Sequence, residues 1–156
     1  MSTTVELNKK INDFTAETND GTISLSDFSG KYLILYFYPK DNTPGCTNES
    51  KDFRDQYEAF KSLNAEIVGV SRDSLKSHQN FIDKYELPFE LIADTEESLC
   101  NQFDVIKDKN MFGKIGRGIE RSTFLINPKG VLIAEWRKVK VAGHVDEVFT
   151  TLKELQ

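Results

Sequence analysis

Two cysteines are the residues of this 156-residue chain best suited to nucleophilic or redox chemistry, and one of them has a distinctive position. Cys46 ends the stretch PKDNTPGC, which directly follows the apolar run YLILYFY. A cysteine that only fills core space belongs inside a helix or strand. This thiol instead lies at the junction between a buried strand and the element that follows it, and proteins often place chemistry at such junctions.

The residues before Cys46 predict that a helix begins there. Thr43 is a good N-cap residue, and Pro44 then occupies the first helical position, where a missing N–H breaks no hydrogen bond. Cys46 falls at the third position, where the unpaired N–H groups and the positive end of the helix dipole favour a thiolate. Gly45 leaves room for a small ligand to approach the backbone. From the residues alone, a reactive thiol and a small buried residue at a helix start are equally good interpretations of Cys46.

The sequence gives little support to other kinds of site. The two cysteines and two histidines are widely spread, so no pair has the spacing of zinc ligands, and we expect neither a metal nor another cofactor. A Cys-x-x-Cys dithiol is excluded because Thr47, Asn48 and Glu49 follow Cys46. The chain also lacks the G-x-S-x-G turn that presents the nucleophile of many serine hydrolases.

Charge and composition exclude further classes of function. The net charge of −5 and pI near 5.1 argue against a general nucleic-acid binder. One basic cluster, interrupted by Asp108 and Glu120, is predicted to be a solvated loop; it consists of Lys107, Lys109, Lys114, Arg117 and Arg121. No segment has the roughly 20 apolar residues of a membrane span, and the N-terminus lacks the apolar core of a signal peptide. Two cysteines make no disulfide framework, so we expect a cytoplasmic protein with free thiols.

The hydrophobic pattern predicts one α/β domain over residues 1–156. The stretch DFTAETNDGTISLSDF predicts a hairpin, and KYLILYFYP and AEIVGVS predict strands buried on both faces. Phe53, Tyr57 and Phe60, at spacings of four and three, predict one amphipathic helix between those strands. Further predicted elements are a strand in FELIAD, a hairpin in RSTFLINPKGVLIAEWR, and helices over 74–85, 96–103 and 144–155. This order fits a thioredoxin-like fold, a central mixed sheet flanked by helices with an N-terminal β-hairpin.

The residues around Cys46 match a known signature. The spacing Pro39-x-x-x-Thr43-x-x-Cys46 resembles the P-x-x-x-T-x-x-C pattern of peroxiredoxins, which are thiol peroxidases with a thioredoxin-like fold. The longer stretch YFYPKDNTPGCTNES resembles the bacterioferritin-comigratory-protein branch, also called peroxiredoxin Q. The resemblance continues through IVGVS, HQNF and GIERSTFLIN, so it covers nearly the whole chain.

The resemblance implies a role for each matching residue of an AhpC/TSA-type domain. Cys46 corresponds to the peroxidatic cysteine, whose thiolate attacks hydrogen peroxide or an organic hydroperoxide in antioxidant defence. Pro39 corresponds to the residue that shields the pocket from bulk water. Thr43 and Arg121 correspond to the donors around the thiolate, and together with Gly45 they would bind the peroxide. Without the resemblance, Arg121 would be interpreted as a surface ion-pair partner of a nearby carboxylate.

The chain departs from the pattern in its second cysteine. Many members of the branch carry a resolving cysteine five residues after the first, where this chain has Lys51, and others carry it in the helix predicted around 78–85. Only Cys100 remains as a candidate resolving residue. We therefore expect an external thiol to recycle the enzyme: thioredoxin, glutaredoxin or a low-molecular-weight thiol. The alternatives are a peroxide sensor that passes oxidation to a partner through a mixed disulfide and a non-catalytic interaction module, and both monomer and dimer stay open.

Overall fold

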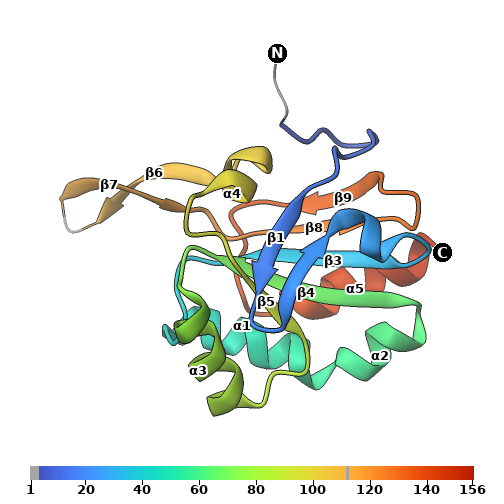
Figure 1. Cartoon of the computed structure of the whole chain (residues 1–156), viewed down its shortest axis with the longest axis horizontal. Coiled ribbons are helices and arrows are strands. Elements are labelled where there is room, and N and C mark those ends of the chain that lie inside the picture. Colours follow the sequence, from blue (N-terminus) through green and yellow to red (C-terminus); the bar gives the residue numbers. More distant parts are fainter. Residues whose placement is uncertain (1–3, 112) are drawn as a thin grey trace.

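A seven-stranded mixed sheet organises the chain in this computed structural model, which describes residues 4–111 and 113–156 (Figure 1). Its strands are β1 (Thr15–Thr18), β2 (Gly21–Ser24), β3 (Tyr32–Phe37), β4 (Ala65–Ser71), β5 (Glu90–Ala93), β8 (Ser122–Ile126) and β9 (Leu132–Trp136). They lie in the order β2-β1-β5-β4-β3-β8-β9. The central strand β3 pairs parallel with β4 and antiparallel with β8. The predicted mixed sheet with an N-terminal β-hairpin is confirmed.

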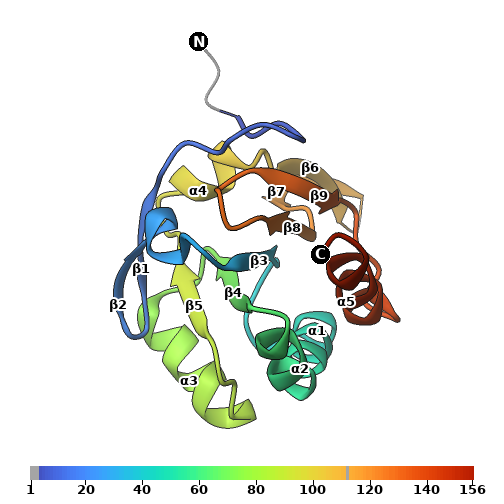
Figure 2. The same ribbon diagram turned by 90° about the vertical axis from the view of Figure 1, so that its right-hand side faces the viewer.

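The sheet separates two hydrophobic cores, because successive side chains of a strand point to opposite faces. Four helices pack on one face of the sheet (Figure 2): α1 (Pro44–Asp55), α2 (Tyr57–Ser62), α3 (Leu75–Tyr85) and α5 (His144–Glu154). The other face carries α4 (Ser98–Gln102) and the 3-10 helix η1 (Leu25–Phe28). Tyr36 of β3 belongs to the core beneath α1, α2, α3 and α5, which we call the first core. Its neighbour Phe37 belongs to the core beneath α4 and η1, the second core. Among the described residues, no helix is long and apolar enough to cross a bilayer.

The segment between β3 and β4 differs from the single helix that the sequence predicts there. The chain makes two helices there, because Gln56 adopts φ −106° and ψ 7° at the end of α1 and interrupts the helical backbone. The prediction of one helix was therefore wrong. Phe53 and Phe60 nevertheless pack into the same core, and Tyr57 packs partly buried against it. The apolar spacing identified the buried face but not the break.

The basic segment near residue 110 is also ordered differently from the prediction of a solvated loop. Strands β6 (Ile106–Met111) and β7 (Lys114–Ile119) form a separate two-stranded antiparallel ribbon. Figure 1 shows this ribbon projecting away from the main sheet. Arg117 on β7 forms an ion pair with Glu97 at 2.7 Å, so the ribbon is tied to the start of α4. The prediction failed because the ribbon residues pair with one another and need no apolar alternation.

Candidate active site

The start of α1 is built as the sequence predicts. Thr43 is the N-cap residue, with extended backbone angles of φ −82° and ψ 153°, and Pro44 is the first helical residue. The N–H of Thr47 donates to the carbonyl of Thr43 at 2.8 Å and is the first donor of the helical pattern. The N–H groups of Gly45 and Cys46 precede it, so they have no acceptor within the helix. They add to the positive electrostatic potential around the Cys46 sulfur.

The Thr43 side chain does not cap the helix. Its hydroxyl donates to the carbonyl of Lys40 at 2.8 Å and makes no hydrogen bond to the first turn of α1. Because the hydroxyl hydrogen is committed to Lys40, the lone pairs of Thr43 Oγ1 stay available to accept a hydrogen bond. The side chain therefore has a fixed direction and an acceptor role at the edge of the helix start.

Arg121 reaches Cys46 from the position just before β8, the strand next to β3. The register of β3 with β8 pairs Phe37 with Ser122, so Arg121 lies at the end of the sheet where the chain turns toward α1. Its Nη2 donates to Cys46 Sγ at 3.3 Å. A Cβ atom placed on Gly45 would lie 3.1 Å from the same Nη2, closer than most side-chain contacts. The absence of a side chain at Gly45 thus leaves the guanidinium room to approach the thiol.

Glu49 holds the other side of the Arg121 guanidinium, and no sequence pattern had singled it out. Its Oε1 accepts from Nη1 at 2.7 Å, while Oε2 has no hydrogen-bond partner among the described residues. Complete burial raises the pKa of Glu49 to about 7, an effect that exceeds the opposite pull of Arg121. Burial alone would lower the pKa of Arg121, but its interactions with Glu49 and Cys46 have the larger effect, so the pKa of Arg121 is raised. The signal that could have found Glu49 is its i+3 spacing from Cys46 on one helix face.

Of the predicted site residues, Arg121 contacts the buried Cys46 thiol, and Thr43 and Gly45 precede that thiol at the start of α1. Cys46 is 1% exposed and the Arg121 side chain 16%, whereas Thr43 and Gly45 are partly exposed. Pro39 lies partly buried just after β3 on the same connection, and its shielding role stays a prediction.

Cys100 belongs to a different environment. It lies on α4 in the second core, together with Phe37 and Phe103 and on the other face of the sheet from Cys46. Burial and the neighbouring carboxylate of Asp94 raise the pKa of Cys100 far above its usual range. That carboxylate accepts the Cys100 N–H at 2.7 Å, so the backbone of Cys100 is tied to the connection between β5 and α4. Such a thiol is packed and unreactive.

Comparison with known proteins decides the family. The model of the AhpC/TSA family matches residues 7–135. Peroxiredoxin Bcp of Bacillus subtilis is 54% identical over 153 residues, which are 97% of this chain and 98% of the relative. The chain belongs to the AhpC/TSA family. Within this peroxiredoxin family it is also 55% identical over 130 residues to peroxiredoxin Bcp of Xanthomonas campestris, covering 83% of this chain and 81% of the relative.

Solved structures of peroxiredoxins agree with the sheet and helices described above. Peroxiredoxin Q of X. campestris superposes with a TM-score of 0.86 at 51% identity over 90% of each chain. A mutant of PrxQ from Xylella fastidiosa gives a TM-score of 0.91 at 42% identity over 96% of each chain. The thioredoxin-like fold is therefore confirmed. As a peroxiredoxin of this kind the protein is a thiol peroxidase, which takes a peroxide as substrate and a thiol as reductant.

Proposed function

We propose that Cys46 is the peroxidatic cysteine of this thiol peroxidase and that it reduces hydrogen peroxide and alkyl hydroperoxides. The observation that carries the proposal is the 3.3 Å contact between Arg121 Nη2 and Cys46 Sγ at the N-terminus of α1. Two sources of positive potential, a guanidinium and a helix end, converge on one buried sulfur. The inclusion of alkyl hydroperoxides is supported by the bacterioferritin comigratory protein of X. campestris, whose solved structures address alkyl peroxide reduction.

The first step is an in-line displacement at oxygen. The Cys46 thiolate attacks the terminal oxygen of ROOH, an S–O bond forms, and the O–O bond breaks to leave a sulfenic acid and RO⁻. Negative charge moves from sulfur to the departing oxygen, which takes up a proton to become ROH. Arg121 is cationic throughout, so it stabilises both the thiolate and the charge that develops on RO⁻. Thr43 Oγ1 accepts the hydrogen of the peroxide hydroxyl and thereby orients the attacked oxygen.

The second half of the cycle uses an external thiol. A thiol R′SH condenses with the Cys46 sulfenic acid to give a mixed disulfide and water, and a second thiol then releases Cys46 and forms a disulfide. This course is supported by Lys51 at the usual position of a resolving cysteine and by the place of Cys100 in the other core. Thioredoxin, glutaredoxin and low-molecular-weight thiols are the reductants to compare. The proposed setting is antioxidant defence in the cytoplasm.

The test is peroxide consumption by wild type, Cys46→Ser and Cys100→Ser with each reductant as sole donor. Hydrogen peroxide and an alkyl hydroperoxide serve as substrates. We expect Cys46→Ser to be inactive with a native far-ultraviolet spectrum, because only the sulfur is lost, and Cys100→Ser to turn over like wild type. A Cys46→Ser protein with near-normal turnover would refute the assignment. Stalling of the wild type after one equivalent of peroxide with all donors would instead favour a sensor.

A further inference from the structure

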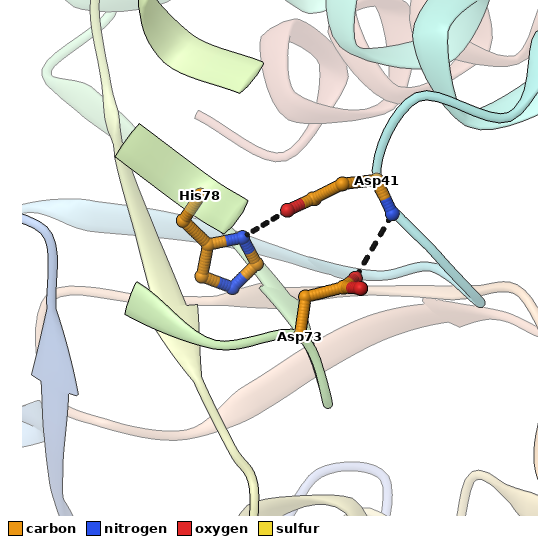
Figure 3. A group of neighbouring side chains, drawn as sticks. All are labelled: Asp41, Asp73 and His78. Atoms are coloured by element: carbon orange, nitrogen blue, oxygen red, sulfur yellow. Dashed lines mark hydrogen bonds and ion pairs between the residues drawn. The ribbon is translucent and has the colours of Figure 1, made fainter. Parts of the chain in front are cut away.

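A buried cluster anchors the connection between β3 and α1, outside the contacts described so far. Asp41 lies in this connection, two residues before Thr43, and its side chain is 2% exposed. Its Oδ1 accepts from the hydroxyl of Tyr38 at 2.7 Å, and its Oδ2 accepts from the hydroxyl of Ser77 at 2.7 Å. The same Oδ2 lies 2.8 Å from Nδ1 of His78 (Figure 3). One carboxylate thus connects the end of β3 with α3.

The position of His78 fixes where its protons lie. The ring is fully buried on α3, and Nε2 lies 2.8 Å from the carbonyl oxygen of Ile92. A carbonyl oxygen only accepts hydrogen bonds, so Nε2 carries a hydrogen. Nδ1 faces Asp41 Oδ2, and a short contact between two groups without hydrogen would be repulsive, so a second proton lies between them. His78 Nδ1 and Asp41 Oδ2 therefore share a hydrogen bond inside the protein.

The backbone connects this cluster to the peroxide site. The peptide group between Lys40 and Asp41 makes two hydrogen bonds, one through each of its ends. Its N–H donates to Asp73 Oδ2 at 2.9 Å, a contact that Figure 3 also shows. Its carbonyl accepts the Thr43 hydroxyl at 2.8 Å. Because a peptide group is planar and rigid, the groups that hold Asp41 also fix the direction of Thr43 Oγ1.

Asp73 is itself held in place. Its Oδ2 accepts from the hydroxyl of Ser71 at 2.6 Å, and its N–H donates back to the same hydroxyl at 3.1 Å. The ligand atoms of Asp41, Asp73 and His78 lie within 4.8 Å of one another, as metal ligands could. The hydrogen bonds already named account for that proximity, since Asp41 and Asp73 each accept from donors of the protein.

We propose that His78 is a positioning residue for peroxide reduction. Through Asp41 it holds the Lys40–Asp41 peptide, and through that peptide it fixes the direction in which Thr43 Oγ1 accepts a hydrogen bond from the peroxide. This inference rests on the proposed function, because it gives Thr43 the role of orienting the attacked oxygen. His78 lies on a different element from Cys46 and contacts neither the sulfur nor Arg121 in the hydrogen bonds of the described residues. Its effect passes only through the geometry of the β3–α1 connection.

Two substitutions at His78 separate this role from a general contribution to folding. The amide nitrogen of Asn takes the place of Nδ1, so His78→Asn keeps a donor to Asp41 and loses the bond to Ile92. The amide nitrogen of Gln takes the place of Nε2, so His78→Gln keeps the bond to Ile92 and loses the donor to Asp41. Each variant loses the ring and one hydrogen bond, and they differ in which bond survives.

The experiment measures the second-order rate of Cys46 oxidation by hydrogen peroxide, by acid quench and intact mass, beside the rate of Cys46 alkylation by iodoacetamide. We expect His78→Gln to be oxidised about tenfold or more slowly than His78→Asn, since small misplacements of an orienting group reduce rates steeply. Alkylation does not need an aimed hydroxyl, so the two variants should be alkylated at similar rates. Equal oxidation rates of the two variants would overturn the proposal.

A second pair of variants repeats the test if a substitution at His78 prevents folding. Asp73→Asn keeps an oxygen that accepts the Asp41 N–H, whereas Asp73→Ala removes it, so only Asp73→Ala should slow oxidation without slowing alkylation. Equal oxidation of these two proteins would likewise overturn the proposal. Failure of the proposed function is distinguished by the wild type: its Cys46 would then remain unoxidised, and the variants would have no rate to lose.

Discussion

Cys46 and Cys100 lie on opposite faces of the central sheet. Cys46 shares its core with Tyr36, and Cys100 shares the other core with Phe37, the next residue of β3. A disulfide needs Cα atoms within about 7 Å, a distance that two helices on either side of a sheet do not reach without unfolding. The separation of the two thiols therefore bears directly on how the enzyme is recycled.

The first prediction is that one equivalent of peroxide, added without a reductant, leaves a sulfenic acid on Cys46 and no internal disulfide. Intact mass should show the gain of one oxygen, and added small thiol should convert it into a mixed disulfide on Cys46. The matched control is Cys100→Ser, which should give the same masses and the same turnover. Loss of two hydrogens, together with a peptide linking Cys46 to Cys100, would contradict the one-cysteine cycle.

The second prediction concerns Arg121, which donates to both Cys46 and Glu49. Arg121→Met should slow the reaction with peroxide about a hundredfold, the effect of removing one preorganised donor from a site where charge develops. Arg121→Lys keeps the charge but lacks the planar guanidinium that reaches both Cys46 and Glu49. Its rate should therefore lie between those of wild type and Arg121→Met. Quenched-flow oxidation of Cys46 measures these rates. An Arg121→Met rate equal to that of wild type would show that the sulfur reacts without the guanidinium.

A double variant controls for the buried carboxylate. Arg121→Met alone leaves Glu49 without its cation in the protein interior, so part of its effect could come from a disturbed α1. Combining it with Glu49→Gln removes the ionisable group. The double variant should regain stability in urea unfolding but should stay as slow with peroxide as Arg121→Met.

The third prediction separates activity from stability at Gly45. In Gly45→Ala the new methyl group would lie 3.1 Å from Arg121 Nη2, so the guanidinium must shift by a few tenths of an ångström, and this shift disturbs its contact with the thiol. Oxidation of Cys46 should therefore slow. Stability should not fall, because Gly45 is helical and Ala is favoured over Gly there by about 0.5–1 kcal/mol. Thermal unfolding and peroxide kinetics on the same samples check both halves, and unchanged kinetics would mean that Arg121 adjusts without loss.

The elements that the sequence could predict are those whose residues face the core. β4 has its predicted bounds, Ala65–Ser71. The helix predicted over 74–85 is α3, with Ser74 as its N-cap and the Ser74 side chain accepting from the N–H of Ser77. The break at Gln56 could not be predicted, because the apolar spacing of Phe53, Tyr57 and Phe60 fits one helix and two helices equally well. The ribbon of β6 and β7 was missed because its strands pair only with each other.

The site was predictable in part. Thr43, Gly45 and Cys46 are neighbours in the chain, so cap rules place them at one helix start without tertiary information. Arg121 is 75 residues from Cys46, and only the resemblance to peroxiredoxins connected the two before the register of β3 and β8 was known. The Asp41–His78 contact depends on the packing of α3 against the β3–α1 connection, which no spacing in the sequence specifies.

The last prediction follows from the buried carboxylate of Glu49. Its pKa is raised from 4.5 to about 7, chiefly by burial, so the folded protein prefers the protonated form. The stabilising effect of that preference is complete below about pH 4.5 and is lost as the pH rises through 7, on the order of 3 kcal/mol in all. Glu49→Gln lacks the titration. Its free energy of unfolding relative to wild type should therefore increase between pH 4.5 and 7.5.

His144 supplies a control of opposite sign. Burial lowers the pKa of this histidine from 6.5 to about 4, and its Nε2 lies 2.8 Å from the hydroxyl of Thr123. The folded protein prefers the neutral ring, so this contribution is complete above pH 6.5 and is lost as the pH falls through 4. Urea unfolding of reduced wild type, Glu49→Gln and His144→Gln at several pH values between 4 and 7.5 measures both effects. Relative to wild type, Glu49→Gln should gain stability as the pH rises, and His144→Gln should gain it as the pH falls. A Glu49→Gln difference that is flat from pH 4.5 to 7.5 would show that Glu49 stays ionised beside Arg121 throughout.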